Sequence, residues 1–190
     1  MAPLYLFDRN ENYTPTDEQF SGAAGLFTRR GVVKSGFNAY VLLAKMKGDI
    51  IYQQEGCCVM RTSQTLQIYL YNYAHYDEQY RQGRAIGLSS TDRYQIFKFK
   101  ALNRVSLTIK GLNPGSYPIQ TWAVNKKEGS AYDEWVKIGA PMTDTPAIIK
   151  YLNSKGAPAE TYGAVNVADG LAVLEFVLEP HDILLAEVQL

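Results

Sequence analysis

Four carboxylates lie close together near the start of the chain, in a polar stretch covering residues 8–19. They are Asp8, Glu11, Asp17 and Glu18. A pair of carboxylates can hydrolyse a glycosidic bond, one as the general acid and the other as the nucleophile or base. That chemistry needs two groups held rigidly on separate elements, whereas these four share one loop. The sequence therefore favours a solvated acidic loop over a catalytic pair within this chain.

A tyrosine-rich run, Tyr-Leu-Tyr-Asn-Tyr-Ala-His-Tyr-Asp, covers residues 69–77. Its members Tyr73, His75 and Tyr76, together with the more distant Trp135, are candidate contacts to a sugar or to a neighbouring domain, because aromatic side chains offer a large apolar face. Strands also favour tyrosine for their own packing. We therefore favour a packed strand whose polar residues secure the turn that follows, with the aromatic sugar surface as the alternative.

Other catalytic and cofactor signals are missing from the sequence. Ser89 and Ser90 have no Gly-x-Ser-x-Gly elbow around them, and no glycine-rich turn carries the Lys-Ser/Thr of a phosphate-binding loop. The two cysteines, Cys57 and Cys58, are neighbours, so a disulfide between them would be strained and two reduced thiols are expected. With only two histidines besides, a zinc site is not expected. We predict no metal and no cofactor.

Charge and hydropathy exclude several classes of partner. The chain has 190 residues, with 19 basic and 19 acidic side chains and a net charge near zero. Nucleic-acid and anionic-membrane binders need a basic surface, so neither partner is expected. The apolar runs are far shorter than the ~20 residues of a membrane-spanning helix, and no signal peptide is visible. The reduced cysteines favour a reducing compartment, and we expect the cytoplasm.

The elements that would position these residues change in character at about residue 55. Before it lie a short strand-like run, Leu4–Phe7, the acidic loop, and a helix that begins around Ser35, a plausible N-cap, and ends at Gly48. The predicted apolar stripe of this helix consists of Phe37, Tyr40, Val41 and Ala44. One strand and one helix cannot bury their own apolar faces. We expect the orphan surfaces to fold back on the rest of the chain or to pair between two copies.

After residue 55 the hydrophobic period changes from 3.6 to 2. Alternating runs predict strands, and two of the connections, at Asn113–Gly115 and at Glu179–Asp182, suggest hairpins between 105–109 and 117–124 and between 171–178 and 183–190. One helix interrupts them, capped by Thr145 and closed by Gly156. The predicted fold class is mainly β, an antiparallel β-sandwich with one inserted short helix, preceded by a strand–loop–helix segment.

Several stretches together resemble glycoside hydrolase family 39, the β-xylosidase and α-L-iduronidase group. The first resembles that family's last barrel strand, its acidic loop and its final barrel helix; the others resemble the opening strand, the inserted segment and the closing connection of its C-terminal sandwich. They are Asp8–Glu11 with Phe20–Leu26 and Gly31–Lys34, then Leu70–Asp77, then Tyr132–Trp135 with Gly139–Pro141, and finally Leu178–Ile183. The resemblance covers nearly the whole chain in order.

The resemblance implies two parts, residues 1–54 as the C-terminal remnant of a (β/α)8 glycosidase barrel and residues 55–190 as an accessory β-sandwich. In that family two catalytic glutamates follow the fourth and seventh barrel strands, consistent with the general rule for such barrels. Both would lie upstream, so no catalytic residue is expected in this chain. Asp8 and Glu11 would contact sugar hydroxyls in the intact parent. The sequence departs from the family at Asn12, often an acid there, and at Ser35, where a proline is usual.

The resemblance therefore implies the C-terminal portion of a retaining, β-xylosidase-like enzyme, inactive when isolated. Its implied partners are a xyloside-type substrate in the parent, the missing barrel and a second copy of the chain. Two alternatives stay open: a non-catalytic carbohydrate-binding module that uses exposed Tyr and Trp faces, and a structural or oligomerisation domain without a ligand.

Overall fold

The computed structural model describes residues 5–8, 19–20, 25–82, 89–98, 101–143 and 145–190. The predicted sugar contact Glu11 and the first residue of the expected strand, Leu4, lie outside these residues. The chain divides into two compact units. A helical unit consists of Met1–Val41, His75–Lys98 and Lys126–Pro158, and a sandwich unit consists of Leu42–Ala74, Phe99–Asn125 and Ala159–Leu190.

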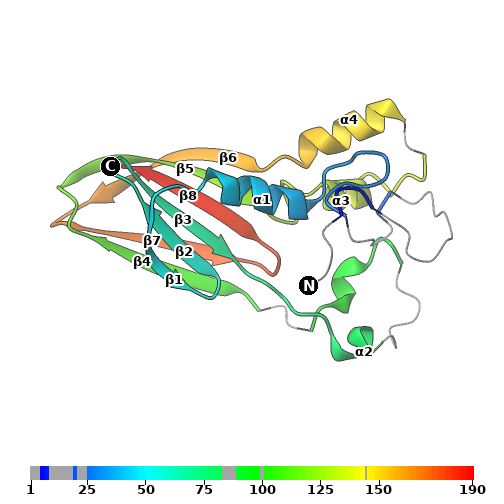
Figure 1. Ribbon diagram of the computed structural model, residues 1–190, viewed down its shortest axis with the longest axis horizontal. Helices are drawn as coiled ribbons and strands as arrows, with labels where there is room; N and C mark the ends of the chain where they lie inside the picture. Colours follow the sequence, from blue (N-terminus) through cyan, green and yellow to red (C-terminus); the bar gives the residue numbers. More distant parts are fainter. Residues whose placement is uncertain (1–4, 9–18, 21–24, 83–88, 99–100, 144) are drawn as a thin grey trace. The chain divides into compact units, whose positions relative to one another are not determined.

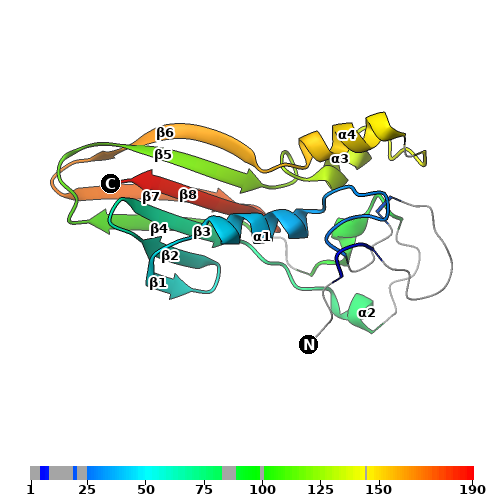
Figure 2. The same ribbon diagram turned by 45° about the horizontal axis from the view of Figure 1, so that its top comes forward.

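The sandwich unit is built on a six-stranded antiparallel sheet in the order β1-β2-β3-β8-β5-β6 (Figure 1). Its strands are β1 (Asp49–Gln54), β2 (Cys57–Arg61), β3 (Thr65–Tyr71), β8 (Ile183–Gln189), β5 (Gly115–Val124) and β6 (Ala159–Val167). Figure 2 shows β6, β5 and β8 side by side, as the pairing requires. β1 pairs with β2, so a strand that ends at the predicted boundary of the barrel remnant belongs to the sandwich unit.

A second, two-stranded sheet of β4 (Asn103–Lys110) and β7 (Leu171–Leu178) packs on the inner face of the larger one. Val105, Leu107 and Ile109 alternate with exposed residues along β4, as the period of two predicts. On the larger sheet, Leu66, Ile68 and Leu70 of β3 are fully buried in the same core. These two layers confirm the predicted fold class, mainly β with antiparallel strands.

The two predicted hairpins are wrong. β4 pairs with β7, while β5 pairs with β6 and β8, so the turns at 111–114 and 179–182 carry the chain from one sheet to the other. Both connections are tied to other strands' ends: the Gly111 amide donates to the Gly170 carbonyl and the His181 amide to the Asn72 carbonyl. Alternation shows which face of a strand is buried but not which strand lies beside it, because hairpins and crossing connections use similar turn residues.

Helix α1 (Ser35–Lys45) has its first part in the helical unit and its last part in the sandwich unit. In the sandwich unit Leu42 is fully buried against Tyr69, Trp122 and Leu185 on the outer face of the larger sheet. The predicted apolar stripe is therefore displaced, since Tyr40 is 51% exposed.

Polar burial explains the displacement. In the helical unit the α1 residue Asn38 is 3% exposed, and its amide donates to the carbonyls of Gly129 and Gly156. Buried backbone carbonyls require such partners, so a polar residue takes a position that hydropathy alone assigns to solvent.

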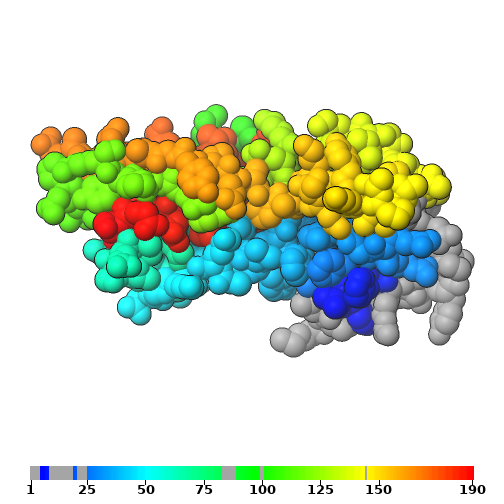
Figure 3. Space-filling view, turned by 90° about the horizontal axis from the view of Figure 1, so that it is seen from above, coloured from blue at the N-terminus to red at the C-terminus, as the bar shows by residue number. Residues whose placement is uncertain are grey.

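The helical unit carries α2 (Glu78–Arg81), the 3-10 turn η1 (Arg93–Ile96), α3 (Ala131–Lys137) and α4 (Pro146–Lys155). The predicted helix is confirmed as α4: the Thr145 hydroxyl accepts from the Ile148 amide at 3.3 Å, and Gly156 follows the last turn. The structure adds α3, which the sequence did not predict. Figure 3 shows the start of α1 (blue) beside α4 (yellow), where the Val33 amide donates to Asn153.

The core of the helical unit joins early and late parts of the chain. Phe20 and Val32 pack with Trp135 of α3 and Leu152 of α4, all buried. By contact, α3 and α4 thus group with the first forty residues, although the sequence assigns them to the segment 55–190. That part of the first segment derives from a barrel stays a prediction. None of the helices in the described residues is long and apolar enough to cross a membrane.

Candidate functional site

Asp8, the predicted sugar contact, is buried and already paired. Its side chain accepts from Lys34 Nζ at 2.8 Å, and its backbone amide donates to the Phe27 carbonyl at 2.9 Å. Gly25 lies so close that a Cβ there would be 2.5 Å from the Asp8 nitrogen. The carboxylate therefore fixes the first chain segment against residues 25–34, with only 3% of its side chain exposed.

The tyrosine-rich run is a strand only as far as Tyr71, the end of β3; residues 72–77 follow it outside any strand, so the predicted packed strand is shorter than the run. Tyr76 lies between two other rings, stacked on Phe97 at 5.2 Å and 17° and tilted against Tyr80 at 5.1 Å. Asp77 caps α2 by accepting from the Gln79 amide. These contacts hold the Tyr76 ring, which is still 45% exposed, and secure the turn.

The neighbouring polar residues of that run have structural contacts or stay at the surface. Asn72 donates to the carbonyls of Ala101 and Leu178. The His75 carbonyl accepts from the Lys98 amide, while the His75 side chain is exposed. Tyr73, in the sandwich unit, is 60% exposed. Tyr73 is therefore more exposed than Tyr76, which is 45% exposed.

Trp135 is not a surface residue. It is 1% exposed at the centre of the helical unit's core, and its indole Nε1 donates to the Pro141 carbonyl at 3.1 Å. A buried ring with a satisfied N–H packs the core and is inaccessible to a sugar.

The sequence analysis missed a polar cluster on α3. The Ser130 hydroxyl caps the helix, and Asp133 accepts from both Ser130 and the Tyr94 hydroxyl, the latter at 2.7 Å. Burial raises the pKa of the Asp133 carboxyl above its ordinary value, against the opposing effect of these hydrogen bonds. Lys126 lies 4.0 Å from the centre of the Tyr94 ring, a cation–π contact. Ser130-Ala-Tyr-Asp133 resembles a helix-capping pattern and is the signal that could have found the cluster.

The adjacent Glu134 on α3 also accepts two side-chain hydrogen bonds at its carboxylate. It accepts from the Tyr151 hydroxyl and from Lys137 Nζ, the latter at 3.2 Å, and the Tyr151 bond lowers the pKa of its carboxyl. A cavity of about 540 Å³ borders this cluster, and four lysines and three acids line it. Because its two most buried acids already have partners, the cluster stabilises α3 and presents no free general base.

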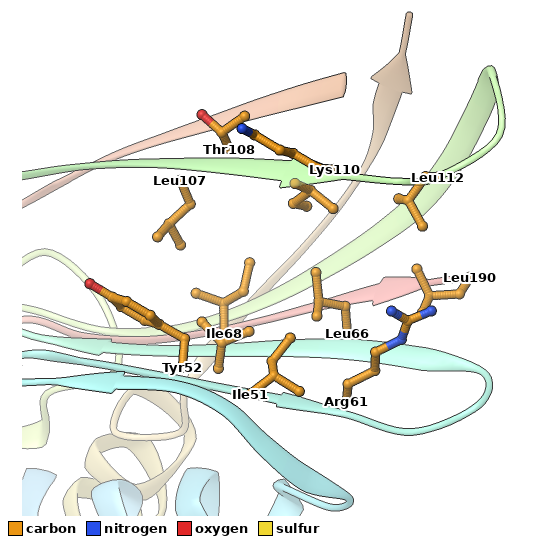
Figure 4. A pocket seen from close by; sticks show the side chains of 12 residues that line it. Ile51, Tyr52, Arg61, Leu66, Ile68, Leu107, Thr108, Lys110, Leu112 and Leu190 are labelled. Carbon is orange, nitrogen blue, oxygen red and sulfur yellow. The ribbon is translucent and has the colours of Figure 1, made fainter. Parts of the chain in front are cut away.

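The sandwich unit contains an apolar groove of about 300 Å³ between its two sheets (Figure 4). Ile51, Leu66 and Ile68 line it from the larger sheet, and Leu107 lines it from β4. It exists because β4 and β7 are too few to cover the whole inner face. None of its lining residues is a carboxylate, histidine or cysteine; the polar side chains among them are Tyr52, Arg61, Thr108 and Lys110. Among the described residues no cluster of three or more His, Cys, Asp or Glu could hold a metal.

Similarity to solved structures is clear at the level of the fold. A monomeric β-xylosidase from Caulobacter crescentus CB15 matches with a TM-score of 0.66 and 23% identity, over 92% of this chain and 34% of that chain. A GH39 enzyme from Xanthomonas axonopodis pv. citri matches with a TM-score of 0.67 and 17% identity, over 97% of this chain and 36% of that one. A bacterial orthologue of human α-L-iduronidase has a TM-score of 0.57 at 17% identity, over 83% of this chain and 27% of its own.

The curated proteins with similar sequences are transcriptional regulators, not glycoside hydrolases. Uncharacterised HTH-type transcriptional regulators of Staphylococcus aureus, including those of strains COL and N315, are 21% identical over 167 residues. The match covers 88% of this chain but only 21% of the regulators. No family model matches the chain. The chain thus has the fold found in about a third of the length of glycoside hydrolase enzymes, and spans about a fifth of its curated relatives.

Proposed function

We propose that this chain is the non-catalytic C-terminal part of a retaining glycoside hydrolase of the family 39 type, whose parent hydrolyses xyloside bonds. The observation that carries the proposal is the fold match over nearly the whole chain, to about a third of two glycoside hydrolases. Fold alone does not define activity. The residues add that the buried carboxylate of Asp8 is held by Lys34, and that of Glu134 by Lys137 of α3 and Tyr151 of α4.

In this proposal the segment before β1 belongs to a barrel, and the sandwich supports that barrel. Leu6 and Phe7 are 57% and 50% exposed, although Phe7 bridges Phe27 in parallel and their rings lie 5.7 Å apart. A parallel sheet that lacks a neighbouring strand would have such a parallel bridge and exposed apolar side chains at its edge. A neighbouring barrel strand, or a second copy of this chain, would cover that flank.

Asp8 is already paired with Lys34, so in this proposal it holds the residues after Phe7 in place instead of contacting sugar directly. Glu11 lies outside the described residues, and we propose that it contacts a sugar hydroxyl in the parent.

The free thiols support a reducing compartment, and we propose the cytoplasm. Cys57 and Cys58 are unpaired, and burial raises the pKa of the Cys57 thiol, which keeps it protonated and unreactive.

A second candidate is a module of a transcriptional regulator. The similarity to the Staphylococcus aureus regulators over 88% of this chain favours it. In that setting the same sandwich would support a regulatory protein without hydrolysing any bond.

The sequence of the encoding gene upstream of Met1 separates the two candidates. The first predicts an in-frame (β/α)8 barrel with glutamates after its fourth and seventh strands. Its full-length product would hydrolyse an aryl β-xyloside, and glutamine in place of either glutamate would abolish turnover. An in-frame helix-turn-helix segment, or a full-length product inactive on aryl xylosides, would refute the first candidate.

A further inference from the structure

The outer face of the larger sheet is covered over only part of its area. Leu42 and Met46 cover one end, over Tyr69, Trp122 and Leu185. Beyond that end, register and alternation place a set of mostly polar residues on the same face. Figure 3 shows the strands that carry them, with β6 in orange, β5 in green and β8 in red. These residues are Ser116, Gln120, Glu160, Tyr162, Asn166, Glu187 and Gln189, here called the outer polar face.

Tyr162 is the aromatic centre of this face. It is 75% exposed, the most exposed of the chain's large apolar side chains in the described residues. Its hydroxyl accepts from Gln120 Nε2 at 2.9 Å and donates to Glu160 at 3.2 Å, and Gln120 also donates to Glu160 at 3.1 Å. The hydrogen bond to Glu160 raises the pKa of the Tyr162 hydroxyl. Three mutual hydrogen bonds therefore hold an exposed ring in one orientation.

A second network continues the face across β8. Glu187 lies directly opposite Gln120 across the β5–β8 pair. One of its oxygens accepts from Gln67 at 2.6 Å and the other from Gln189 at 2.8 Å. Gln67 is in turn fixed by the backbone of Lys45 and Lys47. The carboxylate is thus oriented before any ligand arrives.

We propose that the outer polar face binds a neutral carbohydrate chain, with one pyranose ring lying on the Tyr162 ring. The C–H face of a pyranose matches an exposed aromatic ring, and its hydroxyls match the carboxylate and amide groups around it. The strand residues of this face include two carboxylates and neither Lys nor Arg, while Lys45 of α1 lies 4.5 Å from the centre of the neighbouring Trp122 ring, so the face favours a neutral ligand over an anionic one. Groups held in place before binding lose less entropy when the ligand is bound.

This site needs no barrel and no catalytic residue, so it stands independently of the proposed function. Isothermal titration of the full chain with xylohexaose, cellohexaose and maltohexaose tests it, with hexagalacturonate as the anionic comparison. We expect saturable heat with at least one neutral hexasaccharide and none with hexagalacturonate. Tyr162→Ala is expected to weaken that binding at least tenfold, and Tyr162→Phe less, because the ring remains.

The matched control is Tyr73→Ala, which removes another exposed tyrosine of the sandwich unit. We expect it to leave the affinity unchanged. Both variants should melt at the temperature of the original chain, because neither side chain is buried, and that comparison excludes misfolding. No heat with any neutral hexasaccharide, or equal affinity of the Tyr162→Ala variant, would overturn the proposal. Binding of hexagalacturonate alone would also overturn it.

Discussion

The helical unit and the outer polar face of the sandwich unit use the same polar residue types for different purposes. In the helical unit, Asn38, Asp8 and Glu134 are buried and bonded to other parts of the unit. On the outer polar face, Gln120 and Tyr162 bond to each other while facing solvent. Buried polar groups that are hydrogen-bonded within the protein stabilise the fold, whereas polar groups held in one orientation at the surface are available to a ligand.

This difference is the basis for proposing a ligand site on the outer polar face. The acidic and aromatic residues that a sequence first suggests for sugar chemistry, Asp8 and Trp135, are structural in this fold. Tyr162, which no sequence motif marks, is exposed and fixed. Substitutions in the two regions should therefore separate stability from binding.

The largest effect is expected from Trp135→Ala in the helical unit. The ring is 1% exposed and is packed by Phe20 and Leu152, so its removal leaves a cavity and should cost about 3–5 kcal/mol of unfolding free energy. Urea denaturation followed by circular dichroism measures it. Tyr162→Ala is the surface control and should change stability by less than about 0.5 kcal/mol. Equal losses of unfolding free energy in Trp135→Ala and Tyr162→Ala would contradict the difference between the two regions.

The next effect is expected from Asn38→Ala. It leaves the buried carbonyls of Gly129 and Gly156 without their side-chain donor, which should cost about 2–3 kcal/mol. Gln120→Ala serves as the comparison, because water can replace its bonds at the surface. Urea denaturation midpoints of the two variants measure this difference. A larger loss of stability in Gln120→Ala than in Asn38→Ala would contradict the expectation.

Alkaline unfolding should depend on Tyr69, under α1 in the sandwich unit. Burial raises the pKa of Tyr69 to about 12, so the folded state keeps a proton that the unfolded chain loses near pH 10. The contribution is present below pH 10 and is lost as the pH rises towards 12. It amounts to about 2 kcal/mol by linkage.

Tyr69→Phe should remove this part of the alkaline transition, and the exposed Tyr73→Phe should not. Unfolding free energies at pH 8, 10 and 11.5 test it. Identical pH profiles for the two phenylalanine variants would show that burial of Tyr69 carries no such linkage.

A smaller effect is expected from Asp133→Asn on α3. Burial raises the folded-state pKa of the Asp133 carboxyl above its ordinary value, so the folded chain retains this proton to a higher pH than the unfolded chain does. The contribution of Asp133 to stability therefore falls as the pH rises upward from about 4. Asp133→Asn should flatten the slope of stability against pH above about pH 4, and a steeper slope in the variant would contradict the assignment.

How far the sequence predicts the structure differs between the two units. In the sandwich unit, alternation predicts the buried face of β4 but only one of the two buried faces of β3, where Gln67 and Tyr69 are buried as well. In the helical unit, Thr145 with Gly156 predicts α4. Strand partners were mispredicted, because pairing is decided by contacts far apart in the sequence.

In the helical unit, the buried positions of α1 depend on the carbonyls that Asn38 meets, which no local pattern reveals. The helix α3 was missed even though Ser130 marks its start. The outer polar face could not be read from sequence either, because Tyr162 and Gln120 become neighbours only through the β5–β6 register.

The most direct test of the account is an assay of the purified chain on an aryl β-xyloside at neutral pH. With Asp8 paired to Lys34 and Glu134 bonded within α3, we predict no hydrolysis above the rate in buffer, both for the original chain and for Asp8→Asn. Turnover by the original chain that Asp8→Asn abolishes would show a catalytic acid where the account places only a structural one.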